Sequence, residues 1–404
     1  MLTAWIAWTV AAVYYFYQYV LRSAPSVMMP QLSEAFGLDA LGVASLVGLF
    51  YYGYSPFSLV AGVALDRLGA RRVIPIGAAI VAAGSLLFAT GDAALAGIGR
   101  LLQGAGGVFG LVGAIYVANS SFPASRAATL IGATQMFGMA GGSAGQFLVG
   151  PAIAGGLPWS RFWMIMAVTG AAIAVVLALL LPSPKSEPSG DWRSAALDSL
   201  RTVFRNPQSV LCGLIAGLLM MPTSIFDMVW GVRFLQETAG HPFGEAVMRS
   251  ATVPLGWIIG SPLLGWLSDR IGRRKPVVIG AAAVLFACLA WILFGGTEVL
   301  APYVLGTVTG IASGSVMLLY TVIKEANPPQ LNGTATGVVN FVNFTLSALL
   351  GPVFAALLRN ASGGAAELEL VHYQWAFGPM LAGVGLAVAL AFFLRETGPA
   401  SNRS

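Results

Sequence analysis

The chain has 404 residues, of which 57% are hydrophobic and only 9% are charged, whereas soluble globular proteins carry about 25% charged residues. Its formal net charge is +5, and the basic residues are too scattered to coat a nucleic acid. These figures exclude a soluble enzyme of ordinary composition, a disordered chain, a disulfide-rich secreted protein and a nucleic-acid-binding protein, and they indicate a protein whose main solvent is lipid.

Twelve mostly apolar runs follow one another along the chain. A helix that crosses a membrane needs about 20 such residues, and these runs are too long for the strands of a membrane barrel. We therefore predict an all-α integral membrane protein with twelve transmembrane helices in two pseudo-symmetric six-helix bundles. The predicted spans are 3–29, 40–64, 73–91, 95–117, 128–150, 162–181, 209–235, 246–267, 276–296, 301–323, 335–357 and 375–394.

A polar, proline-bearing segment separates the first six runs from the next six. We predict one bundle at 1–181, a cytoplasmic linker at 182–208 and a second bundle at 209–404. Cytoplasmic segments of membrane proteins are enriched in Lys and Arg. With both termini in the cytoplasm, fifteen of the 21 Lys and Arg residues lie on that side. We therefore expect a multi-pass protein of the cell membrane in this orientation, with a bacterial inner membrane as its setting.

Both halves carry the same loop motif. The segment 62–72, GVALDRLGARR, follows the second run, and the segment 265–275, GWLSDRIGRRK, follows the eighth. Glycine permits a tight reversal between helices, and the basic residues are expected to stay in the cytosolic interface. The informative residues are Asp66 and Asp269, 203 positions apart, because the positive-inside rule does not require them. Parallel repeats of this kind occur in transporters whose solute site lies between the halves, near the midplane.

The paired loop motif resembles the loop signature of the major facilitator superfamily, and the segment 100–106, RLLQGAG, resembles a second signature of that superfamily. The resemblance covers essentially all twelve spans. It implies that spans 1, 4, 7 and 10 line a central cavity, that spans 3, 6, 9 and 12 face lipid, and that the loop aspartate helps to close the cytoplasmic side. The gating residues expected on this basis are Gly62, Asp66, Arg67, Gly69, Asp269, Arg270 and Gly272.

The first run presents Tyr15, Gln18, Tyr19 and Arg22 on one helical face. An arginine inside a span usually faces a watery interior, and its planar fork suits a carboxylate or a phosphate. We expect this face to contact a solute. The alternative is that Arg22 snorkels to the outer interface.

Asp227, in the seventh run, is the only acidic residue deep inside a span, and Trp230 lies on its face. The repeat places Asp227 within about one turn of the position that corresponds to Arg22. The two residues are therefore candidates to face each other, as an ion pair, as the two ends of a zwitterion site or as a proton-coupling pair, with a purely structural pair as the alternative. Arg100 is a second candidate coupling residue, and an internal hydrogen bond to a backbone carbonyl is its alternative role.

Further polar side chains inside spans complete the candidate solute site. Gln135 lies in the fifth run, Asn340 and Asn343 lie in the eleventh, and Tyr54 belongs to an aromatic stretch of the second. Packing between helices explains these residues about as well as solute contact does. A set of glycines at four-residue spacing is expected to permit close helix contact: Gly306, Gly310 and Gly314.

These features predict a secondary active transporter that moves a small polar solute bearing a carboxylate, either an organic anion or a zwitterion such as a short peptide, by alternating access. Protons are one candidate coupling ion. The alternative is an exporter of amphipathic compounds or drugs, which the glycine-rich fifth run and the aromatic walls suggest. The sequence carries no zinc or phosphate-loop motif. The segment 141–145, GGSAG, fits the Gly-x-Ser-x-Gly pattern of hydrolases, but it lies in the middle of a span rather than at a strand-to-helix turn. We therefore expect a monomer without enzyme activity, cofactor or nucleic-acid partner, whose partners are its solute and membrane lipid.

Overall fold

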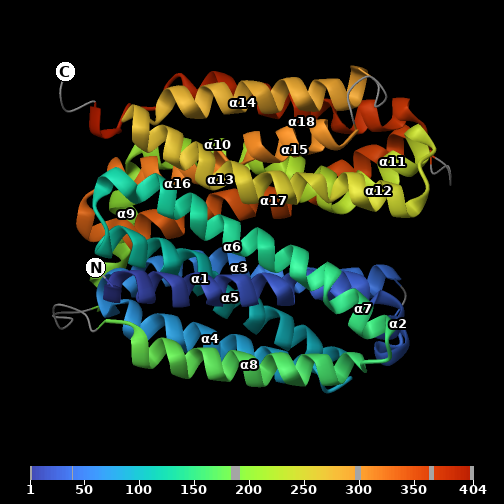
Figure 1. Cartoon of the computed structure of the whole chain (residues 1–404), viewed down its shortest axis with the longest axis horizontal. Coiled ribbons are helices and arrows are strands. Elements are labelled where there is room, and N and C mark those ends of the chain that lie inside the picture. The colour runs from blue at the N-terminus through green and yellow to red at the C-terminus, as the bar shows by residue number, and fades with distance from the viewer. Residues whose placement is uncertain (1, 39, 183–191, 296–301, 364–367, 401–404) are drawn as a thin grey trace. The chain divides into compact units, whose positions relative to one another are not determined.

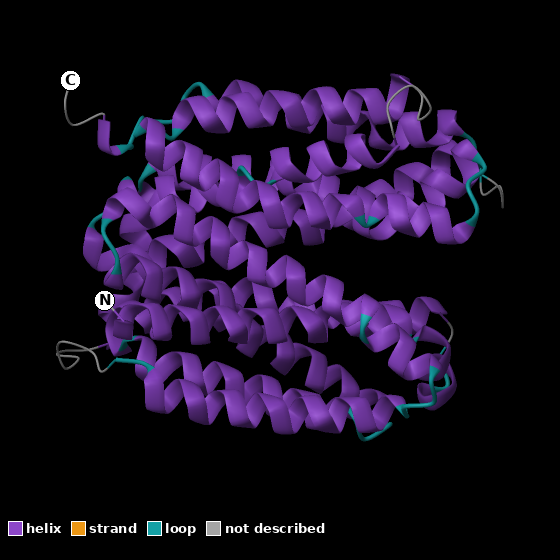
Figure 2. Cartoon of the chain, in the orientation of Figure 1, coloured by secondary structure: helices purple, strands orange, loops and turns teal. Residues whose placement is uncertain are grey.

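The computed structural model describes residues 2–38, 40–182, 192–295, 302–363 and 368–400. Within these residues the secondary structure consists of helices joined by turns and short loops, without strands (Figure 2). The fold is therefore all-helical over the described part of the chain, as the sequence predicts.

Helices lie at each of the predicted spans (Figure 1). In the first half of the sequence they are α1 (Leu2–Ser23), α3 (Ala40–Leu68), α4 (Ala70–Phe88), α5 (Ala93–Ser121), α6 (Ala127–Phe147) and α8 (Trp159–Leu180). In the second half they are α10 (Pro207–Met221) with η3 (Pro222–Gly231) and α11 (Val232–Ala239), α12 (Phe243–Ser250) with α13 (Thr252–Ile271), α14 (Lys275–Ala290) with η4 (Trp291–Gly295), α15 (Pro302–Ser313) with α16 (Val316–Glu325), α17 (Asn332–Ala361) and α18 (Leu370–Ala391). The short elements are η1 (Ala24–Val27), α2 (Met29–Phe36), η2 (Ala124–Arg126), α7 (Val149–Ala154), α9 (Trp192–Arg205) and η5 (Pro329–Leu331).

In the described residues, ten of the long helices or helix pairs are apolar enough to cross a membrane by composition alone, and α1 and α6 fall outside that set. The reason lies in their side chains. Tyrosines and a glutamine lower the mean hydropathy of α1, and glycines with polar residues lower that of α6. A span that holds polar groups for function is harder to recognise by hydropathy than one that only faces lipid.

Several helix ends differ from the predicted limits. The first span ends at Ser23 rather than at residue 29, because Pro25 has no backbone N–H to continue the ladder. The tenth span breaks into α15 and α16 at a turn over residues 314–315. The seventh widens into the π-helical segment η3, which begins at Pro222. The predicted linker also contains a helix, α9, that the apolar runs do not predict. Linker residues 183–191 lie outside the described residues.

Contacts divide the chain into two compact units. Unit 1 comprises Met1–Pro123, Phe137–Asn206 and Asn327–Phe341, and unit 2 comprises Ala124–Met136, Pro207–Ala326 and Val342–Ser404. The start of α6 is thus grouped with unit 2 and the start of α17 with unit 1. The predicted bundles at 1–181 and 209–404, with the linker at 182–208, follow the chain rather than these contacts, and that division stays a prediction.

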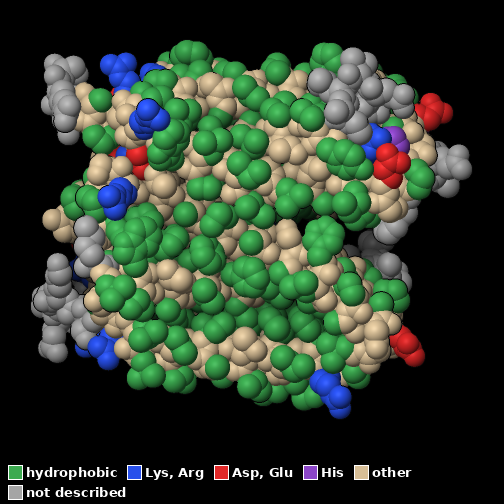
Figure 3. Space-filling model, viewed as in Figure 1, with side chains coloured by type: hydrophobic (Ala, Val, Ile, Leu, Met, Phe, Trp, Pro, Cys, Tyr) green, Lys and Arg blue, Asp and Glu red, His purple; other side chains and the backbone are tan. Residues whose placement is uncertain are grey.

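Burial differs widely among the spans. In the most apolar stretch of α5, 83% of the residues are buried, whereas in α8 only 22% are. The exposed side chains of α8 are large and apolar, including Val168 and Leu179, which suits a helix that faces hydrocarbon. On the face shown in Figure 3, hydrophobic side chains cover the middle of the helices, and the charged side chains lie towards the helix ends.

Candidate functional site

The guanidinium of Arg22 lies in an aromatic frame inside unit 1. Arg22 occupies the last turn of α1, where the free carbonyl groups of a helix favour a cation. Its Nε and Nη2 atoms donate hydrogen bonds to the Tyr51 hydroxyl, at 3.1 and 2.9 Å. Its Cζ atom lies 4.8 Å from the centre of the Tyr19 ring, 4.9 Å from that of Tyr51 and 5.9 Å from that of Phe50. These neighbours are neutral, and their rings attract the cation through cation–π contact.

The other predicted residues of this helix face pack inside the same unit. Tyr15 is fully buried and lies edge-on to Tyr19, with ring centres 5.0 Å apart. Gln18 is also fully buried, and both polar atoms of its amide have no hydrogen-bond partner among the described residues. A buried amide without hydrogen-bond partners is costly, and the predicted contact of Gln18 with a solute stays a prediction. Tyr54 is buried and stacks on Phe50 at 5.5 Å.

Arg100 is also buried in unit 1, and it too lies near the Phe50 ring. Its guanidinium donates to the Val47 and Leu21 carbonyls, at 3.2 and 3.3 Å, and to Gln103 Oε1 at 2.7 Å. Its Cζ atom lies 5.1 Å from the centre of the Phe50 ring. The sequence analysis gives hydrogen bonds to backbone carbonyls as the alternative role of Arg100, and the structure contains such bonds. Its role in coupling stays a prediction.

Asp227 lies in η3, in unit 2, and its carboxylate accepts a hydrogen bond of 3.0 Å from Ser250 Oγ. Trp230, on the same segment, is half-buried. The predicted pairing of Asp227 with Arg22 would join residues of different units, and it stays a prediction. Arg233 forms its ion pair with Glu237, at 2.8 Å, and not with Asp227, as the helical spacing predicts.

The amides of the predicted site lie at contacts between helices. Asn340 donates to Ser58 Oγ at 2.8 Å in unit 1, and Asn343 donates to the Tyr320 hydroxyl at 3.3 Å in unit 2. Gln135 is buried in α6. The two asparagine contacts match the interpretation of these amides as ties between helices, and a contact with solute stays a prediction.

The first loop aspartate caps a helix that is distant in sequence. The Asp66 carboxylate accepts hydrogen bonds from the backbone N–H groups of Gly333 and Thr334, at 2.7 and 2.6 Å, and from Thr334 Oγ1 at 2.6 Å. These residues form the first turn of α17, whose N–H groups have no partner within the helix. A carboxylate satisfies those donors and complements the positive end of the helix dipole.

The second loop aspartate repeats this arrangement in unit 2. Asp269 Oδ2 accepts hydrogen bonds from the backbone N–H and the Oγ1 of Thr129, at 2.9 and 2.7 Å, in the first turn of α6. Its other oxygen pairs with Arg274. The two copies of the loop motif therefore make the same kind of contact: each loop aspartate accepts hydrogen bonds from the first turn of one long helix.

Arg274 corrects one expectation. The sequence analysis placed it with the basic residues of the cytosolic interface, but its side chain is fully buried and pairs with both Asp269 and Glu325, the latter at 2.9 Å. Burial lowers the pKa of Arg274, whereas its hydrogen bonds and charge interactions with Glu325 and Asp269 raise it, and the net pKa lies above its usual value. Two carboxylate partners offset the cost of burying the charge.

The motif glycines have two different tasks. Gly69 and Gly272 have φ angles of 77° and 71°, a region that side chains other than glycine rarely adopt, and they make the reversals that the sequence predicts. Gly62 and Gly265 permit close approach instead. A Cβ atom at either position would lie 2.4 Å from a backbone carbonyl oxygen, that of Gly333 or of Ala128. The glycines at 306, 310 and 314 likewise meet α13 at close range, which confirms their predicted role.

The two arginines that directly follow the loop aspartates make different contacts. Arg67 donates to Ser199 Oγ of α9 at 3.2 Å, and the Arg270 guanidinium lies 5.1 Å from the centre of the Trp266 ring. The hydrogen bond of Arg67 thus connects the first loop to α9, a helix that the apolar runs do not predict.

Sequence reasoning also missed the residues that complete these sites. The aromatic stretch that contains Phe50 and Tyr51 suggests cavity walls and hydroxyl groups but not a contact with Arg22, and no pattern in the sequence points to Ser250 or Glu325. Which tyrosine of α3 contacts Arg22 depends on how α3 packs against α1, and that packing cannot be obtained from the sequence pattern. Among the residues described, the structure shows no group of three or more His, Cys, Asp or Glu side chains that could hold a metal ion.

Comparison with known proteins gives this architecture its family. A family model described as Major Facilitator Superfamily matches residues 11–352. A gentisate transporter of Corynebacterium glutamicum is 24% identical over 81% of this chain and 75% of its own length, and a hexuronate transporter of Bacillus subtilis is 26% identical over 85% of each.

The crystal structure of the fucose:proton symporter of E. coli shares the fold, with a TM-score of 0.76 at 16% identity over 97% of this chain and 99% of that one. The chain is a transporter and not an enzyme, and its fold is the twelve-helix fold that the sequence predicts. The chain belongs to the major facilitator superfamily.

Proposed function

We propose that the chain carries a small organic anion, one that bears a carboxylate, across the membrane by alternating access. Arg22 binds the carboxylate, and Tyr15, Gln18 and Tyr19 contact the rest of the solute.

The observation that carries this proposal is the setting of Arg22. Its planar fork suits two parallel hydrogen bonds to a carboxylate, and in unit 1 its contacts run to a phenol and to aromatic rings. A phenol and aromatic rings carry no charge, so a carboxylate adds an ionic interaction to these contacts. The neighbouring Gln18 amide supplies further hydrogen bonds one helical turn away.

The names of the relatives support the same solute class. Gentisate and hexuronate, the solutes for which two of them are named, are both carboxylates. A zwitterion such as a short peptide also carries a carboxylate, and it remains within the proposed class.

Gating is assigned to the repeated loops. Asp66 holds the first turn of α17, whose residues 332–341 group with unit 1 while its remaining residues group with unit 2. Asp269 holds the first turn of α6 in the corresponding way. The first turns of α17 and α6 group with a different unit from the last turns of these helices. In alternating access each first turn separates from the loop aspartate that caps it, and breaking these capping hydrogen bonds is that step. Gly62, Gly69, Arg67, Arg270 and Gly272 maintain the loops in which the aspartates lie.

The membrane orientation is part of the proposal. Both termini and the 182–208 linker lie in the cytoplasm, since that orientation places most Lys and Arg residues inside. The protein works as a monomer, and membrane lipid surrounds its apolar helices.

The test is a thermal-shift screen of the purified protein against a panel of carboxylates, phosphates, amines and neutral sugars. The proposal predicts that the stabilising compounds are carboxylates and that liposomes containing the protein take them up. A screen in which only amines or large amphipathic compounds stabilise the protein would contradict it and would favour the exporter alternative.

A further inference from the structure

Unit 2 contains a pocket of its own, separate from the aromatic frame of Arg22. It has a volume of about 70 Å³ and is lined by side chains from η3, α11, α12, α13, η4 and α15, all of which belong to unit 2. A cavity of this size has room for water molecules.

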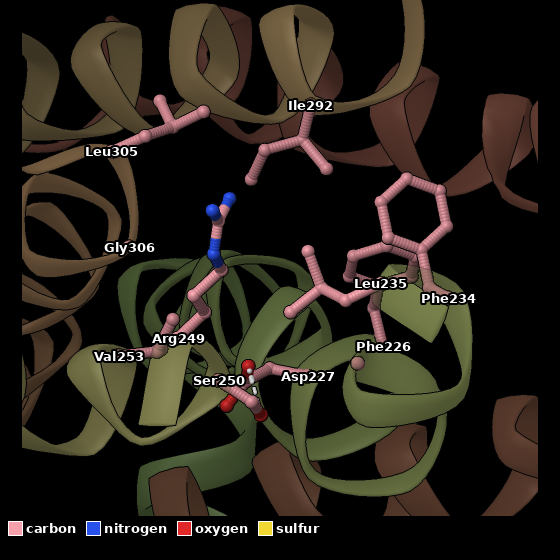
Figure 4. A pocket seen from close by; sticks show the side chains of 11 residues that line it. Phe226, Asp227, Phe234, Leu235, Arg249, Ser250, Val253, Ile292, Leu305 and Gly306 are labelled. Carbon is pink, nitrogen blue, oxygen red and sulfur yellow. Dashed lines mark hydrogen bonds between the residues drawn. The ribbon is translucent and has the colours of Figure 1, made fainter. Parts of the chain in front are cut away.

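The walls of this pocket are mostly apolar, and its two charged groups lie apart. Figure 4 shows Asp227 and Ser250 together, while the Arg249 guanidinium points away from them towards Ile292 and Leu305. Arg249 is neutralised by its own helix: its Nη2 and Nε atoms donate to Glu245 Oε1, at 2.6 and 3.1 Å. The pocket therefore presents one carboxylate whose charge Arg249 does not balance.

The remaining charges around the pocket are also paired locally. Arg233 and Glu237, on α11, form an ion pair of 2.8 Å, and Glu237 accepts a further hydrogen bond from Tyr373 of α18. His241 lies 3.8 Å from Glu245. The side chains that η4 and α15 contribute to the pocket carry no charge. Within the described part of the chain, the one hydrogen-bond partner of the Asp227 carboxylate is Ser250, at 3.0 Å.

The backbone around Asp227 leaves space beside its carboxylate. Asp227 lies in the middle of the π-helical segment η3, and π-helical turns occur frequently at functional sites. A Cβ atom on Gly231 would lie 3.1 Å from both Asp227 Oδ1 and Ser250 Oγ. The wide turn and the missing side chain thus leave space beside the carboxylate, inside apolar walls.

We propose that this pocket is the proton site of the transporter, in which the Asp227 carboxylate binds the coupling proton and Ser250 positions it. A carboxylate in apolar surroundings is stabilised by binding a cation. Metal cations with oxygen ligands need about six of them, and the pocket offers the side-chain oxygens of Asp227 and Ser250. A proton needs one oxygen atom.

The chemistry is a simple proton transfer. A hydronium ion gives its proton to one oxygen of Asp227, an O–H bond forms, and water is released; no electrons are exchanged. The bond from Ser250 then loses its ionic character and weakens, because hydrogen bonds to charged acceptors are about twice as strong as neutral ones. That bond joins η3 of the seventh span to α12 at the start of the eighth. Protonation thereby loosens the contact between two spans of unit 2, which is how the proton biases the conformational cycle.

This inference rests on the proposed function for its role in transport, but the site itself is tested with protons alone. Infrared difference spectra between acid and alkaline pH, recorded on the full chain in lipid nanodiscs, show the carbonyl stretch of each carboxyl group that binds a proton. We expect one such band to vanish in Asp227→Asn, to shift in frequency in Ser250→Ala and to persist in Asp227→Glu. Glu237→Gln is the matched control and leaves the band in place, because Glu237 is already paired. A spectrum of Asp227→Asn identical to that of the wild type overturns the assignment.

The second measurement compares two modes of transport in liposomes, using the carboxylate that gives the largest thermal shift. Asp227→Asn is expected to retain exchange of labelled for unlabelled solute and to lose accumulation driven by a pH gradient, whereas Glu237→Gln retains both. Gradient-driven accumulation in Asp227→Asn, or accumulation that follows a sodium gradient instead, overturns the proton site. If the wild type moves no carboxylate at all, the proposed function fails, and the infrared result still decides the site.

Discussion

Arg22 directs two of its guanidinium nitrogens at a single oxygen, the hydroxyl of Tyr51, at 3.1 and 2.9 Å. A carboxylate has two oxygens, and it accepts hydrogen bonds in parallel from two nitrogens of a guanidinium. The Tyr51 hydroxyl thus orients the guanidinium without neutralising it. The helical periodicity of α1 does not predict this contact, because Tyr51 lies on α3.

The capping aspartates give the first prediction. Asp66→Asn and Asp269→Asn should each lower the rate of solute uptake while leaving the amount of protein in the membrane unchanged, because each removes a charge from the first turn of α17 or α6. Asp92→Asn is the matched control: Asp92 caps its own helix, α5, through Leu95. Uptake rates are measured at equal protein levels. Wild-type uptake by the Asp66/Asp269 double variant would reduce the motif to a turn.

Close approach at Gly62 gives the second prediction. Gly62→Ala should lower the melting temperature and slow uptake, because the new Cβ atom would lie 2.4 Å from the Gly333 carbonyl oxygen, and overpacking of this kind costs about 1–3 kcal/mol. Gly280→Ala is the control, since nothing lies within 4 Å of a Cβ atom there. Thermal denaturation of both variants in one detergent checks the difference. An equal effect of the two substitutions would show that α3 and α17 do not need this contact.

The buried ion network of Arg274 gives the third prediction. Arg274→Met should destabilise the protein by about 3–5 kcal/mol, because it leaves Asp269 and Glu325 without their counter-ion. Arg273→Met, at the exposed neighbouring position, should change stability by about 0.5 kcal/mol or less. The raised pKa of Arg274 means that its contribution is complete below the usual arginine pKa and is lost only above it. Titration of Arg274 itself therefore leaves stability flat through neutral pH, and thermal denaturation at several pH values checks this.

Membrane orientation gives the fourth prediction. In a chain whose two free cysteines, Cys212 and Cys288, have been replaced, Ser362→Cys should react with an impermeant thiol reagent in intact cells, and Ser189→Cys should not. The reason is the excess of Lys and Arg on the side of the linker. Labelling at 189 without labelling at 362 would invert the orientation.

The sequence predicts this fold well where one physical signal dominates. Long apolar runs give the spans, and the repeated loop gives the internal symmetry, because both depend on residue type alone. Hydropathy is weakest for α1 and α6, whose polar side chains lower the mean. The break after Ser313 and the widening at Pro222 depend on backbone geometry within otherwise regular apolar runs, so the limits of those spans were predicted without them.

The site was predictable in part. Arg22 and Asp227 stand out because charges inside spans are costly. Their partners, Tyr51 and Ser250, do not stand out, because a hydroxyl in a span has many explanations. The capping of α17 by Asp66 was also hidden, since the residues that meet a helix end are set by tertiary packing and not by their distance along the chain.

The central claim is that Arg22 binds the carboxylate of the solute, and equilibrium binding of a stabilising carboxylate to purified variants tests it most directly. Lysine keeps the charge but lacks the planar fork, so both Arg22→Lys and Arg22→Ala should weaken binding about ten-fold or more, as expected when a charged hydrogen bond worth about 1.5–3 kcal/mol is lost. Arg161→Lys, at an exposed position of α8, should bind as the wild type does. Wild-type affinity in Arg22→Ala would contradict the account and move the solute site elsewhere.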